Sequence, residues 1–410
     1  MAKKSKRRAA KASVASRTRV ASKPRAARKP PAAARKARGS AQRLPLTGIR
    51  VVEFTHMVMG PTCGMILADL GAEVITVEPP GGDKTRKLIG SGAGFFSLFN
   101  RNKKSITADL ADPKDRARIE KLVATADIVS ENFRAGALAK HGFDYASLKK
   151  KYKRLIYVSH KGFLPGPYDH RVALDEVVQM MAGLAYMTGP PGRPLRAGSS
   201  VNDIMGGMFG AIGALAALAE REHTGRGQEV QVGLFENCVL LSAQHMLQYR
   251  LTGVASPPMP DRINAWGVFD LFETSDGEQV FLGVVTDTQW AVFGRAFDLG
   301  GLAEDPRLAT NNQRVQARSW MLPALRDIVK RYSAKDLQAV FEREGLPYAP
   351  IVKPEQLFDD PHLLASGGLA DLTLANGEKT PVPLLPILLG GRHLKPRMPL
   401  AKLGEHDGEV

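Results

Sequence analysis

The feature of this sequence that most limits its fold is the region 48–161, where short apolar runs alternate with longer amphipathic segments. Four runs rich in Val and Ile predict buried strands: "GIRVVEFT" (48–55), "AEVITVEPP" (72–80), "DIVSENF" (127–133) and "RLIYVSHKGF" (154–163). Segments between them, such as 62–71 and 113–126, have the pattern of helices. Strands that alternate with helices form βαβ units, so we expect an α/β, Rossmann-like fold with a parallel sheet covered on both faces.

The first predicted strand leads into a turn that lacks a dinucleotide-binding fingerprint. The segment "HMVMGP" (56–61) stands where a G-x-G-x-x-G motif would open the first helix. This argues against a nicotinamide or flavin dehydrogenase, although the strand and helix alternation is Rossmann-like.

The second half of the chain changes in character near residue 262. Before it we expect helices over 173–188 and 202–223 and a strand in "GQEVQVGLFE" (227–236). After it, two alternating strands flank the turn "SDGE" (275–278), which predicts a hairpin, and helices follow in series. The predicted organisation is a basic tail (1–43), a large Rossmann-like domain (44–261), a small α+β domain (262–370) and a C-terminal strap (371–410) that returns to the large domain.

The net charge of +16 belongs to the tail. Residues 1–43 contain 16 Lys and Arg and no Asp or Glu, so the rest of the chain is neutral. Such a segment cannot bury a core, and we expect it to be disordered. It is compatible with a polyanion-binding arm, which would make nucleic acid a partner through the tail alone, with a transit peptide, or with a solvated appendage.

The remaining composition favours a cytoplasmic protein. The longest apolar run, 204–219, is shorter than the ~20 residues of a membrane-spanning helix, and we expect a core helix there. The two cysteines, Cys63 and Cys238, form no motif and are expected to be inert core thiols in a reducing compartment.

Asp203 is the residue with the most chemical promise. It stands at the head of a long apolar, glycine-rich run, "VNDIMGGMFGAIGALAALAE" (201–220). Asp is common at helix starts, where it serves as a cap, so the residue pattern alone leaves a structural role and a nucleophilic role open.

A set of motifs over about 44–410 resembles the class III CoA-transferases, the family of formyl-CoA and carnitine CoA-transferases. The motifs are "LTGIRVVEFTHMVMGPTCGMILADLGAEVITVEPPGGDKTR", "NRNKKSITADL", "DIVSENFRAGAL", "DEVVQMMAGL", "HTGRGQEVQVGLFE", "TDTQW" and "LGEHDGEV". The resemblance implies a Rossmann-like large domain, a small domain and a homodimer whose two chains interlock like linked rings.

The resemblance places the family's catalytic aspartate at Asp203. Its carboxylate would attack an acyl-CoA thioester, form a mixed anhydride and then an aspartyl-CoA thioester, and pass CoA to an incoming carboxylate. CoA thioester is then a substrate, with no permanently bound cofactor and no metal. With an ordinary pKa of ~3.9, the carboxylate is expected to be ionised at neutral pH without a general base.

The resemblance also suggests residues that bind CoA. The loop from His56 to Met59 matches the segment around the pantetheine, although Val58 replaces a glutamine found in formyl-CoA transferase. The remaining candidates for the nucleotide and its phosphates are Asn132, Phe133, Lys140, Arg86 and Arg101. The glycine-rich shielding loop of formyl-CoA transferase is reduced here to Gly267.

The substrate is predicted less closely. The segments "SHKGFLPGPY" and "RPLRAGSS" are similar to those of dicarboxylate-handling members, particularly mesaconyl-CoA transferases, and suggest Arg196 and His160 as holders of a free carboxylate. Intermolecular transfer from succinyl-CoA to a small acid is the alternative. A second alternative is an α-methylacyl-CoA racemase on the same fold, with Asp175 as its acid or base and His141 or His160 as partner, although Leu174 stands where racemases have His.

Overall fold

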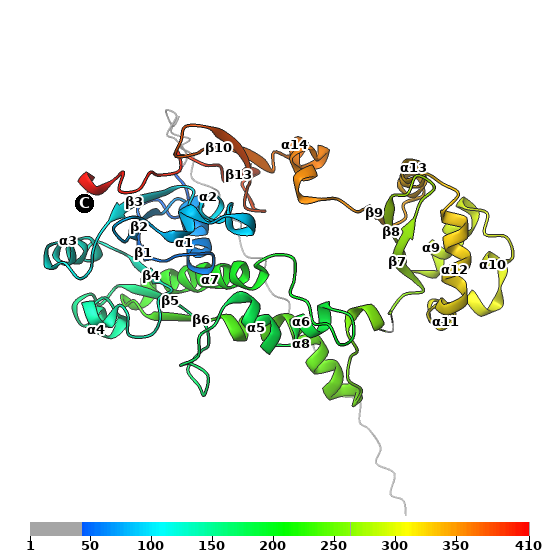
Figure 1. The fold of residues 1–410 in the computed structure, drawn as a ribbon, viewed down its shortest axis with the longest axis horizontal. Coiled ribbons are helices and arrows are strands. Elements are labelled where there is room, and N and C mark those ends of the chain that lie inside the picture. Colours follow the sequence, from blue (N-terminus) through cyan, green and yellow to red (C-terminus); the bar gives the residue numbers. More distant parts are fainter. Residues whose placement is uncertain (1–42, 263, 410) are drawn as a thin grey trace, which may run out of the picture. The chain divides into compact units, whose positions relative to one another are not determined.

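A six-stranded parallel sheet dominates the computed structural model, which describes residues 43–262 and 264–409 (Figure 1). Its strands lie in the order β3-β2-β1-β4-β5-β6, the Rossmann order, and every neighbouring pair is parallel. The strands are β1 (Arg50–Phe54), β2 (Glu73–Glu78), β3 (Lys103–Thr107), β4 (Ile128–Glu131), β5 (Ile156–Lys161) and β6 (Glu229–Gly233). The predicted α/β fold is confirmed. The predicted tail lies outside the described residues, apart from Arg43.

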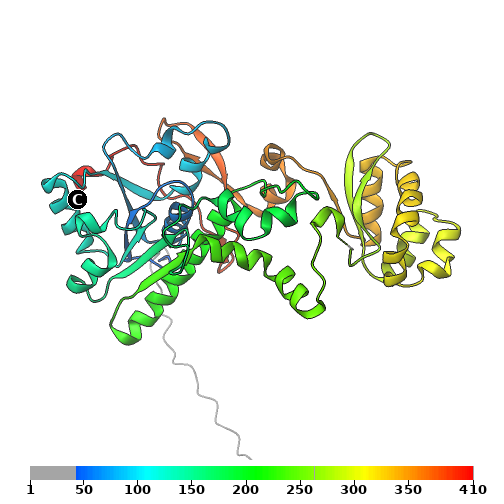
Figure 2. The same ribbon diagram turned by 60° about the horizontal axis from the view of Figure 1, so that its bottom comes forward.

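Helices cover both faces of this sheet, and each face has its own apolar core (Figure 2). On one face, α1 (Met59–Asp69) and α7 (Val201–Thr224) pack against Val51, Ile128 and Val158. On the other face, α3 (Pro113–Val123) and α4 (Tyr145–Lys151) pack against strand residues of opposite parity. This two-sided burial explains why the strands are continuous apolar runs.

Two predicted elements differ in the structure. The helix predicted over 173–188 is divided into α5 (Asp175–Met181) and α6 (Leu184–Thr188), because Gly183 between them has a positive φ of 85°. The strand predicted over 227–236 ends at Gly233, and Leu234 begins a helix that was not predicted, α8 (Leu234–Thr252). Short α2 (Phe95–Phe99) was also not predicted.

The region after residue 262 forms an antiparallel sheet with helices around a separate apolar core. Strands β7 (Val268–Glu273) and β8 (Gln279–Val284) form the predicted hairpin, and β9 (Tyr348–Pro350) adds a third strand beside β8. The helices of this region are α9 (Asp287–Ala296), α10 (Gly301–Glu304), α11 (Asn311–Gln316), α12 (Arg318–Val329), α13 (Ala334–Glu344) and α14 (Pro361–Ser366), of which α9, α12 and α13 contribute the buried helical residues of that core. The predicted domain boundaries themselves stay predictions.

The C-terminal residues return to the parallel sheet. After the two hairpins β10 (Leu369–Thr373) with β11 (Lys379–Pro383) and β12 (Leu388–Leu389) with β13 (Arg392–His393), the chain runs beside β3 (Figure 1). The Thr107 backbone N–H donates to Asp407 Oδ1 over 2.7 Å, and the His406 N–H donates to the Ser105 carbonyl over 3.0 Å. These contacts cover the edge of β3, as expected for a returning strap.

Among the described residues, α7 is the one helix long and apolar enough, by length and composition, to cross a membrane. Its glycine-rich face packs on α1, β5 and β6. Its other face, with Met208, Phe209 and Ile212, is exposed in the single chain, so the predicted core helix is buried on one face only.

Candidate active site

Two segments predicted to bind CoA meet at the centre of the sheet, where β1 and β4 are neighbours. From β1 the chain adds β2 and β3 on one side of the sheet, and then crosses to add β4, β5 and β6 on the other side. Folds of this type bind ligands beside this switch point, at the carboxyl ends of the strands. The His56 backbone N–H donates to Asn132 Oδ1 over 3.0 Å, and Asn132 Nδ2 donates to the His56 carbonyl over 2.8 Å. The His56 and Phe133 rings lie 5.4 Å apart. The predicted loop and the "ENF" segment therefore form one surface.

In the rest of the His56–Met59 loop, Met57 is exposed, whereas Val58 and Met59 are buried. Met57 has a positive φ of 64° and is 39% exposed, and its backbone N–H donates to Thr85 Oγ1. Val58 is buried in the core, and its carbonyl accepts hydrogen bonds from the backbone N–H and the hydroxyl of Thr62. Met59 is also buried, and it packs against Gly206 of α7.

The glycines of α7 allow that helix to lie close to the elements below it. A Cβ at Gly206 would lie 2.6 Å from Met59 Cε, and one at Gly207 would lie 2.5 Å from Thr62 Cβ. At Gly210 a Cβ would collide with the His160 ring. Protein atoms therefore fill the space beside all three glycines. The glycines bring the first turn of α7 beside the Met59 loop.

Asp203 lies on that first turn and is half-buried. The carboxylate of Asp175 accepts the backbone N–H groups of Asn202 over 2.9 Å and Asp203 over 3.0 Å. Two of the unpaired donors at the start of α7 are satisfied in this way. Asp175 therefore caps the helix, and the side chain of Asp203 is not used as a cap.

Burial and the nearby negative charge of Asp175 raise the pKa of Asp203 to about 7, although Arg196 acts in the opposite direction. The prediction of an ordinary, fully ionised carboxylate at neutral pH is therefore wrong. A carboxylate poorly stabilised by solvent is a more reactive nucleophile than an ordinary one.

Gln179 links Asp175 to the loop that carries Arg196. Its side-chain amide donates to Asp175 Oδ1, and its Oε1 accepts the Ala197 backbone N–H over 2.9 Å. The Arg196 guanidinium is 3.6 Å from Glu176 and is 37% exposed at its side chain. Arg196 is thus a partly exposed cation whose charge acts on Asp203.

Two of the predicted phosphate-binding cations are engaged elsewhere. Arg101 is 1% exposed and holds Asp69 over 2.7 Å, so it is not available to a phosphate as predicted. Arg86 is paired with Glu78 over 2.6 Å and stacks on the ring of Phe96. Neither position supports the predicted role without rearrangement.

Lys140 remains a candidate. It is exposed, and no ion pair is described for it within residues 43–262 and 264–409. It follows the "ENF" segment closely in the chain, as the prediction requires.

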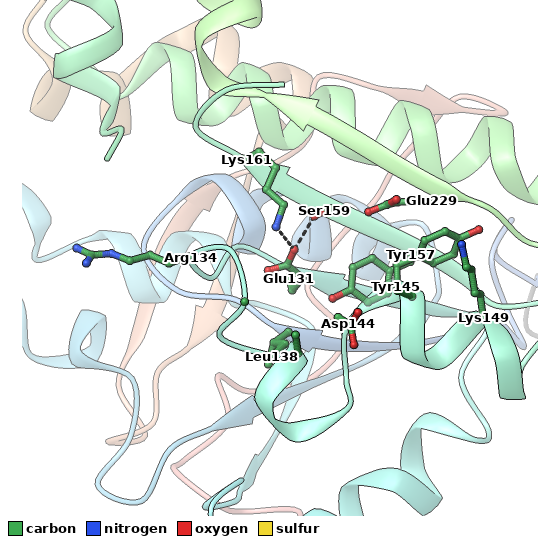
Figure 3. Close-up of a pocket in the computed structure, with 13 residues that line it drawn as sticks. Glu131, Arg134, Leu138, Asp144, Tyr145, Lys149, Tyr157, Ser159, Lys161 and Glu229 are labelled. Carbon is green, nitrogen blue, oxygen red and sulfur yellow. Dashed lines mark hydrogen bonds and ion pairs between the residues drawn. The ribbon is translucent and has the colours of Figure 1, made fainter. Parts of the chain in front are cut away.

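A cavity of about 290 Å³ adjoins the "ENF" segment, and Figure 3 shows Lys161 and Ser159 pointing toward Glu131 within it. Lys161 Nζ and Ser159 Oγ each donate to Glu131 Oε1 over 2.6 Å. Lys161 ends β5 and is 28% exposed at its side chain. Sequence analysis missed this cation, because its place beside Glu131 depends on β4 and β5 being neighbours.

The structure gives two other predicted residues packing roles. His160 is 3% exposed, and burial, helped by Lys161, lowers its pKa to about 3. A buried, neutral imidazole cannot hold a substrate carboxylate, so that prediction is wrong. Gly267 lies directly against Arg314, where any Cβ would collide with it, which accounts for the glycine without a shielding role.

The sheet has the Rossmann strand order, and α7 packs beside the loop at its switch point, where α/β proteins of this type commonly bind ligands. The family comparison is more specific: the sequence model of CoA-transferase family III matches residues 46–407. The chain belongs to this family and is a class III CoA-transferase, which uses a CoA thioester as substrate.

Named relatives and a solved structure are similar over most of the chain. The succinate–glutarate CoA-transferase of Agrobacterium fabrum is 35% identical, over 89% of this chain and 94% of that protein. The succinyl-CoA–D-citramalate CoA-transferase of Chloroflexus aurantiacus is 34% identical, over 78% and 82%. The crystal structure of a CAIB/BAIF family protein from Brucella suis has a TM-score of 0.80 and 34% identity, over 90% and 98%.

Proposed function

We propose that this enzyme transfers CoA from succinyl-CoA to a small dicarboxylate of about five carbons, through Asp203 as the nucleophile. The named relatives support the substrate class, because both pair a succinyl or succinate group with a five-carbon dicarboxylic acid, glutarate or D-citramalate. Both names also describe transfer between two molecules. We therefore favour intermolecular transfer over movement of CoA within one mesaconyl-CoA molecule.

The observation that carries the mechanism is the position of Asp203: half-buried, on the first turn of α7, with its pKa raised to about 7. Its carboxylate oxygen bonds to the acyl carbon of succinyl-CoA, and CoA leaves as thiolate. The thiolate sulfur then bonds to Asp203 Cγ, and succinate leaves as the carboxylate. The incoming acid reverses both steps. Low exposure to water protects the anhydride and thioester from hydrolysis.

Arg196 is proposed to hold the free carboxylate of the dicarboxylate. Its guanidinium is partly exposed, its charge acts on Asp203, and its pairing with Glu176 at 3.6 Å is loose enough to exchange for a substrate. A planar guanidinium can grip a carboxylate through two parallel hydrogen bonds. Lys140, which is exposed, is a proposed cation for the phosphates of CoA.

Isotope exchange tests the proposed function without knowledge of the acceptor. Succinyl-CoA incubated with ¹³C-succinate should yield labelled succinyl-CoA with wild-type enzyme and none with Asp203→Ala. Asp203→Asn should also be inactive, because an amide is not a nucleophile of this kind. Exchange by purified Asp203→Ala at the wild-type rate would rule out the mechanism.

The racemase alternative fits the site less well. Asp175 is buried, and its carboxylate already accepts hydrogen bonds from Asn202, Asp203 and Gln179. His160, one of its proposed partners, is buried as well. Incubation of an α-methylacyl-CoA in deuterated water should therefore give no α-deuterium incorporation.

We also propose that the enzyme is a cytoplasmic homodimer. Several large apolar side chains of α7 and α8 are exposed in the single chain, which suits burial against a second copy. They include Met208, Ile212, Leu240, Met246 and Leu247. Cys63 and Cys238 are both free, consistent with a reducing compartment. Light scattering after gel filtration measures the oligomeric state.

A further inference from the structure

Asp175 is a buried carboxylate whose hydrogen-bond partners are all neutral. Its oxygens accept from the side-chain amide of Gln179 and from the backbone N–H groups of Asn202 and Asp203. Within residues 43–262 and 264–409, no Lys, Arg or His forms an ion pair with it. Its negative charge is therefore not cancelled by a cation and lies beside the backbone of the proposed nucleophile.

We propose that Asp175 is a positioning residue for CoA transfer, which holds the first turn of α7 and, by repulsion between like charges, raises the energy of the free carboxylate of Asp203 relative to its acylated forms. This inference rests on the proposed function, in which Asp203 is acylated. It adds a role for a second carboxylate that does not touch the substrate.

The charge of Asp175 matters because Asp203 loses its own negative charge in both covalent steps. In the first step a carboxylate oxygen of Asp203 bonds to the acyl carbon, the carbon–sulfur bond breaks, and the negative charge leaves on CoA thiolate. In the second step the thiolate sulfur bonds to Asp203 Cγ, the Cγ–oxygen bond to the acyl group breaks, and the charge leaves on the released acid. In both covalent forms Asp203 is neutral. Repulsion from Asp175 therefore acts only on the free carboxylate and favours the covalent forms.

The other groups around Asp203 do not replace Asp175 in this role. Arg196 is the opposing charge, and it is shared with Glu176. Asn237 of α8, which contacts Asn202 in the first turn of α7, carries no charge. Met59 and Thr62 of α1 lie against Gly206 and Gly207 and are uncharged, and the neutral His160 of β5 lies further along the helix, against Gly210. Asp175 is thus the negative charge that acts on Asp203.

Gln179 connects Asp175 to the loop that carries Arg196. It is fully buried, and its amide contacts both Asp175 and the Ala197 backbone. The same side chain therefore fixes the helix cap and the loop of Arg196. We expect Gln179→Met, which keeps the volume and the charge of Asp175, to raise KM for the dicarboxylate while leaving the pH midpoint of the reaction in place.

The decisive variant is Asp175→Asn, which keeps an oxygen for the helix cap and removes the charge. The succinate exchange rate is measured against pH, and the fraction of enzyme that carries CoA after addition of succinyl-CoA is measured by intact-protein mass spectrometry. Loss of a like charge should move the acid limb of the pH profile down by about one pH unit and lower the ratio of CoA-bound to free enzyme by about tenfold.

The matched control is Asp112→Asn, which alters a capping carboxylate on α3. It should change neither readout. Asp175→Ser, an uncharged capping residue, gives the same comparison if the Asn variant does not fold. A lower rate with unchanged pH profile and unchanged covalent fraction would overturn the proposal and leave Asp175 a structural cap. Absence of any CoA adduct on wild-type enzyme would instead contradict the proposed function itself.

Discussion

His56 and Asn132 exchange two hydrogen bonds across the switch point of the sheet, backbone N–H to Oδ1 over 3.0 Å and Nδ2 to backbone carbonyl over 2.8 Å. The pair joins the loop after β1 to the segment after β4. Because both segments are predicted to contact CoA, this one side chain sets the shape of the proposed CoA surface.

Asn132→Ala should therefore weaken CoA binding. Loss of two hydrogen bonds of about 1 kcal/mol each should raise KM for succinyl-CoA by up to about thirtyfold. Because Asp203 lies on a different element, kcat should fall less than kcat/KM. Steady-state exchange kinetics measure both, with Asn376→Ala, in an exposed turn, as the control. An unchanged KM would show that this pair does not shape the CoA surface.

Gly207→Ala should destabilise the protein. Its Cβ would lie 2.5 Å from Thr62 Cβ and 2.6 Å from the Met59 carbonyl oxygen, so α7 would have to move away from α1. Overpacking of this kind costs about 1–3 kcal/mol, and a clear fall in Tm is expected. Gly94→Ala, where nothing lies within 4 Å of the added Cβ, should leave Tm near that of the wild type. Equal Tm values for the two variants would contradict the close packing of α7.

Asp203→Asn should change the pH dependence of stability. The pKa of Asp203 is about 7 in the folded chain against 3.8 as the ordinary value, so folding favours the protonated form. Its contribution is fully present below about pH 3.8 and is lost as pH rises through about 7. The variant should therefore gain Tm over wild type at pH 8.5 relative to pH 5.5. The exposed Asp359→Asn should show no such trend, and a gap that stays constant with pH would argue against the raised pKa.

Arg196→Gln should discriminate between acids. If the guanidinium holds the free carboxylate, loss of a charged hydrogen-bonding partner should raise KM for succinate or glutarate by about tenfold or more. Transfer to a monocarboxylate, which offers nothing for Arg196 to hold, should change little. Parallel KM measurements with glutarate and butyrate test this. The same loss for both acids would mean that Arg196 supports the loop rather than the substrate.

Sequence patterns predicted the parallel sheet because its strands are buried on both faces and so are unbroken apolar runs. The start of α8 escaped prediction because the chain passes from strand to helix at Gly233 with no side-chain cap to mark the change. Only Gly253, with a positive φ of 72° after the last helical residue, gives a signal for that helix.

Local motifs predicted where some of the candidate residues lie, and their roles stay predictions. The "HMVM" and "ENF" segments do meet, and Asp203 does lie on a helix start. The burial of Arg101 and of His160 could not be predicted from local motifs. Arg101 is buried against Asp69, 32 residues away in the chain, and His160 is buried against Gly210, 50 residues away. Likewise, Asp175 is the first residue of α5, but its carboxylate caps α7 through Asn202 and Asp203, a contact between segments far apart in the chain.

The most direct test of the account is the covalent state of Asp203. Wild-type enzyme is mixed with succinyl-CoA in the absence of an acceptor, quenched in acid, digested and examined by mass spectrometry. The proposed mechanism predicts CoA attached through a thioester to the peptide that contains Asp203. This adduct should be removed when succinate or glutarate is added before the quench, and it should be absent from Asp203→Asn. Rapid transfer with CoA on no peptide, or with CoA on a peptide that lacks Asp203, would contradict the mechanism.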